Sequence, residues 1–185
     1  MTNNIISHNC VGARICQKKN MKYGTPFVWC VIPPDDFFYL YSHYNDINYK
    51  NIKLEKEKND YKIVVDGKIN VYYVHYRYDA RYKTPVKKSG IDIMYCDIEK
   101  YIVEKYTTRL ERMKDLPFFI VTDRIFQTKP DCNFKRDDLI KYVDKDDCLV
   151  VTCDKSITGK NVIYVKNKNL DPIEIAEIIL KENKI

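Results

Sequence analysis

Glycine is scarce in this sequence, at 5 of 185 residues. The sequence contains no G-x-x-x-x-G-K-[ST] loop, no G-x-G-x-x-G turn and no G-x-S-x-G elbow. These motifs use glycine where the backbone must approach a phosphate or turn sharply into a helix. Their absence argues against P-loop nucleotide hydrolysis, dinucleotide binding and a serine-hydrolase elbow.

Long apolar runs are also missing. No window approaches the roughly 18 apolar residues of a membrane span, and the sequence does not begin with a basic segment followed by an apolar run. We therefore expect no membrane span and a cytoplasmic protein.

Paired cysteines at metal or redox spacing are absent as well. The seven cysteines are an odd number and contain no C-x-x-C pair. In a chain large enough to need no disulfide staples, this indicates a reducing compartment, with neither a structural zinc site nor a thioredoxin-like motif. We predict no metal and no cofactor, and we expect most of the thiols to be core residues.

Charge of one sign does not dominate. The formal net charge is +6 and the estimated pI is 8.8, but 26 acidic residues are scattered among the 32 basic ones. Lys, Asn, Ile and Tyr are abundant together, which an AT-rich genome produces without selection for charge. We expect a solvated surface and no nucleic-acid partner.

Length and hydropathy patterns predict one α/β domain over residues 1–185. A strand at 4–7 precedes a helix at 11–21, and a second helix starts near residue 34. Two β-rich runs flank Asp66-Gly67, which predicts a hairpin with a two-residue type I′ turn. A polar loop at 79–92, a helix at 96–113 and a strand, helix, strand, strand, helix series follow. Together these predict a mixed sheet that contains the hairpin and is flanked by helices.

Cys10 is the candidate nucleophile, since it lies between the first strand and the first helix. The helix dipole there would stabilise a thiolate. His75, near the end of the second hairpin strand, is the candidate base. The alternative is that Cys10 is a buried structural thiol and His75 a hydrogen-bonded strand residue.

Further residues could complete such a site. Asp79 follows His75 by four positions and Asp123 ends the strand "FFIVTD", so either could orient the histidine. The backbone N–H groups after Cys10, beginning with Val11, could stabilise an oxyanion, and Asn9 could add a donor. His8 is too close to Cys10 in sequence to act readily as its base.

Arg109 and Arg112 lie on the polar side of the predicted helix at 96–113. Two guanidinium groups at this spacing could bind a phosphate or a carboxylate. Ion pairs with Glu104, Glu111 or Asp115 are an equally good explanation of both arginines.

The segments "ISHNCVGARI" and "MKYGTPFVW", a strand ending in "HY", a helix with "RLER" and a strand ending in Asp occur in that order. This pattern resembles an uncharacterised family of exopolysaccharide-biosynthesis proteins, which has a similar S-x-N-C-x-G opening, a T/S-P pair, an H-Y and an R-x-x-R-I-like helix. It is also similar to papain-like cysteine peptidases with an early N-C and P-F-x-W, although Val28 stands where those have Asp. The matching positions are Asn9, Cys10, Pro26, Phe27, Trp29, His75, Tyr76, Arg109 and Arg112.

The resemblance implies a Cys-His site in a papain-like α/β setting, associated with surface glycans. It places Trp29, Tyr76, Arg109 and Arg112 near a small-molecule or glycan substrate. Two hypotheses follow. One is a cysteine-dependent hydrolase or an acyl- or glycan-modifying transferase. The other is a non-catalytic protein that binds a sugar phosphate or glycan of the same pathway.

Overall fold

The computed structural model describes residues 4–57, 60–79, 84–87, 98–113, 116–123, 129–167, 169–182 and 184. The side chains of residues 74–79, 84–87 and 98 lie outside this description. The strands are β1 (Ile5–Ser7), β2 (Ile52–Glu57), β3 (Asp60–Val65), β4 (Ile69–Asp79), β5 (Thr84–Lys87), β6 (Phe118–Thr122), β7 (Cys148–Thr152) and β8 (Val162–Tyr164). The helices are α1 (Val11–Lys18), α2 (Pro34–Ser42), α3 (Ile98–Leu110), the 3-10 turn η1 (Pro130–Cys132), α4 (Arg136–Ile140) and α5 (Pro172–Lys181).

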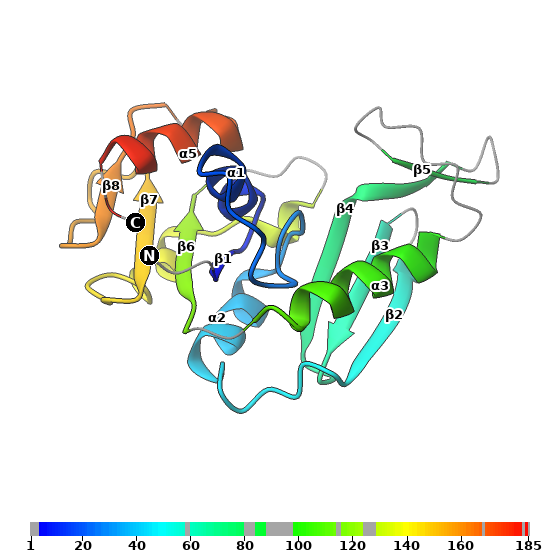
Figure 1. The fold of residues 1–185 in the computed structure, drawn as a ribbon. Coiled ribbons are helices and arrows are strands. Elements are labelled where there is room, and N and C mark those ends of the chain that lie inside the picture. Colours follow the sequence, from blue (N-terminus) through cyan, green and yellow to red (C-terminus); the bar gives the residue numbers. More distant parts are fainter. Residues whose placement is uncertain are drawn as a thin grey trace.

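The predicted α/β class is confirmed, with parallel and antiparallel strands and the hairpin, but the strands form two sheets where one mixed sheet was predicted (Figure 1). A parallel sheet has the order β1-β6-β7-β8, and an antiparallel sheet has the order β2-β3-β4-β5. Two of the strands differ from the sequence-based prediction. Strand β2 was not predicted, and β5 lies within the segment predicted as a loop.

The hairpin at Asp66-Gly67 is confirmed, with one difference in its connection. Both residues have positive φ, 53° and 67°, as a type I′ turn requires. Lys68 N–H donates to the Val65 carbonyl at 3.0 Å. The strands pair Val65 with Ile69, so three residues connect them where two were predicted.

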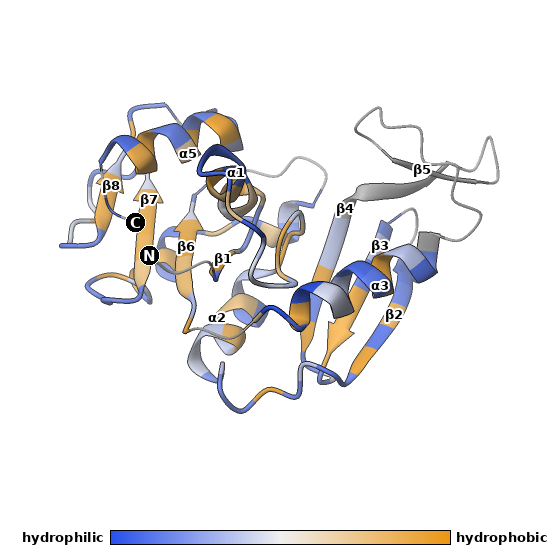
Figure 2. Cartoon of the chain, in the orientation of Figure 1, coloured by the Kyte–Doolittle hydropathy of each residue, from blue (hydrophilic) through white to orange (hydrophobic). Residues whose placement is uncertain are grey.

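The parallel sheet has a different set of helices on each face. Helices α1 and α5 lie side by side over one face, where Val11, Ile15, Ile175 and Ile179 pack on alternate strand residues such as Ile5 and Ile120 (Figures 1 and 2). On the other face, Ile6, Phe119 and Val121 pack with Phe37 of α2 and Leu139 of α4.

The neighbouring strands β1 and β6 therefore connect to opposite faces of the sheet. The helix that follows β1, α1, lies on one face, and α4, which follows β6, lies on the other. Such a point, where adjacent parallel strands connect to opposite faces, opens a crevice at their carboxyl ends, and ligands of open α/β sheets bind there. The carboxyl ends of β1, β6 and β7 are thus the place to look for a site.

One core joins the two sheets. Residues of the parallel sheet, the antiparallel sheet, α2 and α3 share a single buried cluster. Val31 and Tyr72 exchange backbone hydrogen bonds of 2.8 Å, and Ile32 N–H donates to the His8 carbonyl at 2.9 Å. The segment 28–32 is thereby held between β4 and the end of β1, next to Cys10.

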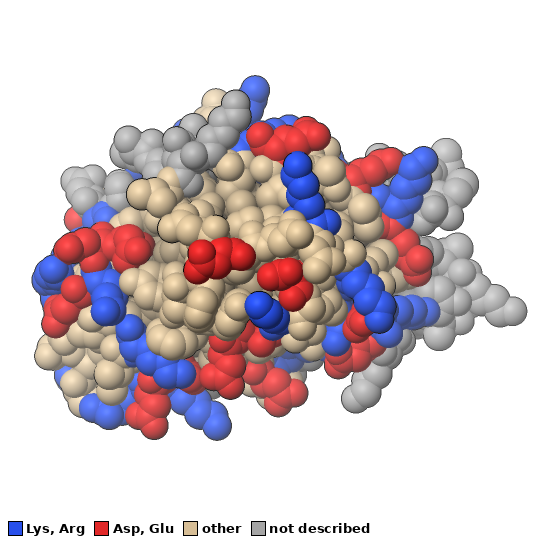
Figure 3. Space-filling view, turned by 90° about the horizontal axis from the view of Figure 1, so that it is seen from below, with Lys and Arg blue, Asp and Glu red and all other residues tan. Residues whose placement is uncertain are grey.

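The surface carries both signs of charge close together. On the face shown in Figure 3, basic and acidic side chains alternate, and neither sign forms a large patch. Within the described residues, no helix is long and apolar enough to cross a membrane.

Candidate functional site

The S-x-N-C-x-G segment forms the turn from β1 into α1. Ser7 Oγ donates to the Asn9 carbonyl (2.5 Å) and accepts from Gly12 N–H (2.9 Å), while Asn9 Oδ1 accepts from Val11 N–H (3.0 Å). A Cβ at Gly12 would lie only 2.9 Å from Ser7 Oγ. Ser7 and Asn9 therefore satisfy two N–H groups at the start of this helix, and the absence of a side chain at Gly12 leaves room for Ser7 Oγ.

His8 lies at the centre of this turn and is completely buried. Its Nε2 accepts from Thr122 N–H at 3.1 Å and lies 3.2 Å from Asn9 Nδ2. An acceptor nitrogen cannot carry a proton, so Nε2 is unprotonated. The ring also packs on Phe134, with centroids 4.0 Å apart. His8 therefore links the end of β1 to β6.

Cys10 precedes α1 and is only 5% exposed. The Val11 N–H predicted as an oxyanion donor already donates to Asn9, and Gly12 N–H donates to Ser7. An oxyanion at Cys10 would have to displace the Asn9 side chain.

The proposed partners on β4 are described only as backbone. The side chains of His75, Tyr76 and Asp79 lie outside the described residues. The pairing of β3 with β4 shifts register, with Lys62 opposite Tyr72 and Asp60 opposite Arg77. Because of this shift, counting alternate residues from the buried Tyr73 does not establish on which face of the sheet His75 lies. The Cys10–His75 pair therefore stays a prediction.

Two arginines and two aromatic rings form a cluster between α1 and α3, which we call the Arg-aromatic cluster. The guanidinium carbon of Arg14 lies 4.7 Å from the Trp29 ring centroid, and that of Arg109 lies 5.3 Å from the Tyr23 ring centroid. Trp29 Nε1 donates to the Tyr23 hydroxyl at 3.0 Å, and the two rings are nearly perpendicular. Trp29 and Arg109 were predicted near a substrate, whereas Arg14 and Tyr23 were not.

The two positive charges of this cluster are not balanced by a carboxylate of the described residues. No ion pair between described residues involves Arg14 or Arg109, and Glu104 lies 3.9 Å from Lys100 instead. Arg14 Nε is buried without a hydrogen-bond partner in the described part of the chain. A buried unused donor on a cation is costly unless a ligand or solvent satisfies it.

The backbone of the cluster is strained at one residue. Trp29 has φ = 60°, a left-handed conformation that bulky residues rarely adopt. Such strain costs on the order of 1–3 kcal/mol and tends to occur at functional sites. The Val28 carbonyl before it accepts from Arg109 Nη1 at 3.3 Å.

Cys10 lies beside this cluster. Cys10 and Arg14 are four residues apart and thus share a face of α1. Burial raises the pKa of the Cys30 thiol, Cys10 raises it further, and Arg109 opposes both, so Cys30 is within electrostatic reach of Cys10 and Arg109. Trp29 and Arg109 are therefore brought into one cluster and Cys10 precedes the helix that carries Arg14 of this cluster, while Arg112 is exposed beyond the end of α3.

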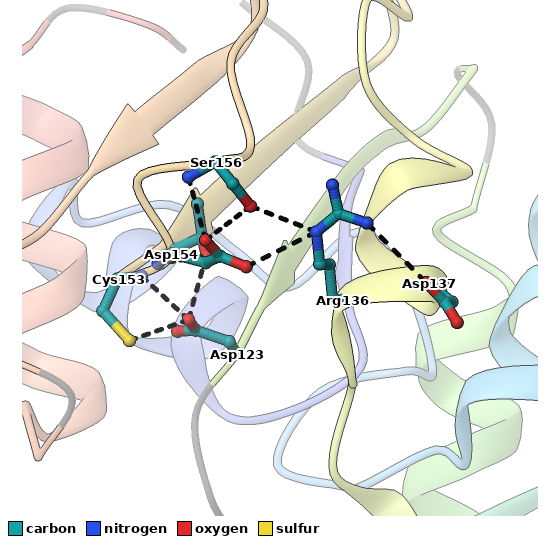
Figure 4. A network of polar contacts seen from close by, with 7 residues as sticks. Asp123, Arg136, Asp137, Cys153, Asp154 and Ser156 are labelled. Carbon is teal, nitrogen blue, oxygen red and sulfur yellow. Dashed lines mark hydrogen bonds and ion pairs between the residues drawn. The ribbon is translucent and has the colours of Figure 1, made fainter.

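Asp123 follows β6 and forms part of a second polar group (Figure 4). Its Oδ2 accepts from Thr152 Oγ1 (2.9 Å), Cys153 N–H (2.8 Å) and Cys153 Sγ (3.0 Å). Asp123 thus holds the turn after β7, and no hydrogen bond between described residues joins it to β4. Within the described residues, no group of three or more His, Cys, Asp or Glu could hold a metal ion.

These features define an α/β protein with a switch point in its parallel sheet and polar groups gathered at the carboxyl edge of that sheet. The chain belongs to the family of the Domain of unknown function (DUF1919), whose profile matches residues 1–171. No curated protein matches the chain.

Proposed function

We propose that this protein binds an anionic sugar, a sugar phosphate or a uronic acid, in a cytoplasmic step of surface-polysaccharide biosynthesis. The observation that carries the proposal is the Arg-aromatic cluster, in which Arg14 and Arg109 stack on Trp29 and Tyr23 without a carboxylate partner among the described residues. The pathway rests on the resemblance of the sequence to exopolysaccharide-biosynthesis proteins.

The chemistry of these side chains fits such a ligand. A guanidinium group binds phosphate or carboxylate oxygens through paired N–H donors. Stacking on an aromatic ring holds each guanidinium in place before the ligand arrives, which reduces the entropy lost on binding. The exposed parts of Trp29 and Tyr23 offer apolar surface for the C–H face of a sugar ring.

Tryptophan fluorescence tests the proposal directly, since Trp29 is the single tryptophan of the sequence. We expect glucose 1-phosphate and glucuronate to change its emission in a saturable way, and glucose to leave it unchanged. The variants Arg14→Gln and Arg109→Gln should each weaken binding of the anionic sugars by about tenfold or more, since each removes a charged hydrogen-bond donor.

Lys105→Gln is the matched control. Lys105 is exposed one turn before Arg109 on the same helix, and its replacement removes the same charge. It should bind the anionic sugars as the wild type does. Equal losses in all three variants would mean that only net charge matters, and unchanged binding in both arginine variants would reject the proposal.

A second candidate is catalysis at Cys10, favoured by its place at the start of α1 on the same helix face as Arg14. In this mechanism His75 accepts the proton of the Cys10 thiol, and Asp79 or Asp123 orients His75. The thiolate attacks the carbonyl carbon of an ester or amide, the bond from that carbon to the alcohol oxygen or amine nitrogen breaks, and the alcohol or amine leaves with the proton from His75, so that a thioester remains on Cys10. The acyl group then passes from sulfur to water or to a glycan hydroxyl.

Iodoacetamide labelling, read by mass spectrometry, tests this candidate. Cys153 is the most exposed of the described cysteines, and the other five are buried. Accessibility alone predicts that Cys153 reacts before Cys10. An activated Cys10 reacts first near pH 7, because only the thiolate is nucleophilic. Labelling in the order of exposure, together with a Cys10→Ala variant that keeps all turnover of ester and glycan substrates, would rule out catalysis at Cys10.

A further inference from the structure

A cavity of about 380 Å³ lies at the carboxyl ends of β6 and β7, away from the Arg-aromatic cluster. Its walls come from the residue after β6, the turn after β7 and the segment that begins α4. It therefore opens at the carboxyl edge of the sheet, beside the switch point between β1 and β6, where open α/β sheets bind ligands. Its volume is within the range of about 300–1,000 Å³ for small-molecule sites.

The polar wall has unused hydrogen-bonding groups of both kinds. Oδ2 of Asp123 accepts hydrogen bonds from three donors, whereas Oδ1 accepts no hydrogen bond from the described residues. Arg136 Nε donates to Ser156 Oγ at 3.1 Å, and Nη1 lies 4.0 Å from an Asp137 oxygen, which leaves Nη2 without a described partner. Figure 4 shows these groups at the same edge, around Asp154.

The charges of this wall cancel. Asp123 and Asp154 are acidic, and Lys135 and Arg136 are basic. Arg136 Nε also lies 3.7 Å from Asp154 Oδ2. A cavity balanced in this way does not favour a free ion of either sign, but a hydroxyl group can donate to Asp123 and accept from Arg136.

The remaining wall is apolar. Phe134, Leu139 and Ile157 line the cavity and are almost completely buried. Phe134 is fixed by its packing on His8 and Phe37. An apolar floor with a few convergent polar groups is the usual form of a small-ligand site. In this cavity the apolar wall matches the C–H face of a pyranose, and the polar wall matches its hydroxyl groups.

We propose that this cavity binds the ring of a neutral monosaccharide, with neighbouring hydroxyls donating to Asp123 Oδ1 and accepting from Arg136. The ligand class follows from the balanced charge, the paired donor and acceptor, and the apolar floor. This site does not depend on anion binding at the Arg-aromatic cluster.

The test is titration of the ¹⁵N-labelled full chain with glucose, galactose and N-acetylglucosamine, followed by amide chemical shifts. At least one of these sugars should shift the amides of Arg136, Cys153 and Asp154 in a saturable way, with a Kd of about 1 mM. Asp123→Asn keeps an oxygen for the three existing donors but replaces Oδ1 with an amide nitrogen, so it should weaken binding by about tenfold. Arg136→Gln, at an exposed position, should do the same.

Asp146→Asn provides the matched control, because Asp146 is an exposed carboxylate paired with Lys160 at the opposite end of β7. It should bind sugar normally. Absence of saturable shifts with all three sugars, wild-type binding by both cavity variants, or stronger shifts of the same amides by inorganic phosphate would overturn the proposal. Arg109→Gln should leave sugar binding in the cavity unchanged, which separates this test from that of the proposed function.

Discussion

Ser7 and Gly12 should be energetically coupled, because a single close contact joins them. A Cβ added at Gly12 would meet Ser7 Oγ at 2.9 Å and Ile5 Cγ2 at 3.2 Å. The same Ser7 oxygen accepts the Gly12 N–H at 2.9 Å. The perturbation is therefore a double-mutant cycle of Ser7→Ala and Gly12→Ala.

The magnitudes follow from these contacts. Gly12→Ala should cost about 1–3 kcal/mol through overpacking, partly offset by about 1 kcal/mol from the better helix propensity of alanine. Ser7→Ala should cost about 1–3 kcal/mol, since it leaves the buried Gly12 N–H without its acceptor. In the Ser7→Ala background the closest obstacle is gone, so the second substitution should cost about 1 kcal/mol less than it does alone.

Urea unfolding of the four proteins, followed by circular dichroism, measures this coupling. In a chain of this size, 1 kcal/mol also shifts the melting temperature by about 2–4 °C. Additive effects of the two substitutions would show that Ser7 and Gly12 are not in close contact. Their hydrogen bond and tight packing would then not explain why serine and glycine occupy these two positions of the turn.

Three further outcomes concern stability. Asn161→Ala should lower the free energy of unfolding in urea by about 3 kcal/mol or more. Asn161 Nδ2 lies within hydrogen-bond distance of three backbone carbonyls, and Oδ1 accepts from Asp144 N–H at 2.7 Å. A loss below about 1 kcal/mol would contradict this. Asp171→Ala should cost about 1 kcal/mol, because Asp171 accepts from two N–H groups of α5, and an unchanged melting temperature would refute it. Burial raises the pKa of the Cys16 thiol from 9.0 to about 11, so the unfolded chain releases a proton that the native chain keeps, and stability falls as pH rises from 9 to 11. In the Cys16→Ala variant, stability should fall less steeply between pH 9 and 11 than in the wild type. Equal slopes in the two proteins would contradict a raised pKa of Cys16.

The sequence predicted most elements of the parallel sheet because each has a clear hydropathy pattern and a clear end. The last helix, which covers this sheet, also has a clear start, since Asp171 accepts from two N–H groups of its first turn and Pro172 is its first residue. β2 was missed because "IKLEKE" is highly charged and its strand pairs with one neighbour only. β5 was missed because Pro85 and the polar residues around it are typical of a loop.

Hydropathy patterns do not show how strands distribute between sheets. The two runs of the hairpin pair locally, but whether they join β1 and β6 depends on packing between residues distant in sequence. The segment that carries Val31 and Ile32 lies between the two sheets, hydrogen-bonded to Tyr72 of β4 and to His8 after β1, and no local sequence pattern indicates this arrangement.

Part of the Arg-aromatic cluster could be predicted from the sequence. The resemblance predicted that Trp29 and Arg109 lie near the substrate. The four-residue spacing of Cys10 and Arg14 indicates that both lie on one face of α1. Arg14 could not be matched to Trp29, since their contact depends on how the chain turns back after α1. Tyr23 was missed for the same reason.

Anion recognition at the Arg-aromatic cluster is the central claim, and the emission of Trp29 measures it most directly. Addition of glucose 1-phosphate to the wild type should produce a saturable change that glucose does not produce, that Arg109→Gln weakens and that Lys105→Gln preserves. An emission that responds equally to glucose and glucose 1-phosphate, or not at all, would contradict the claim.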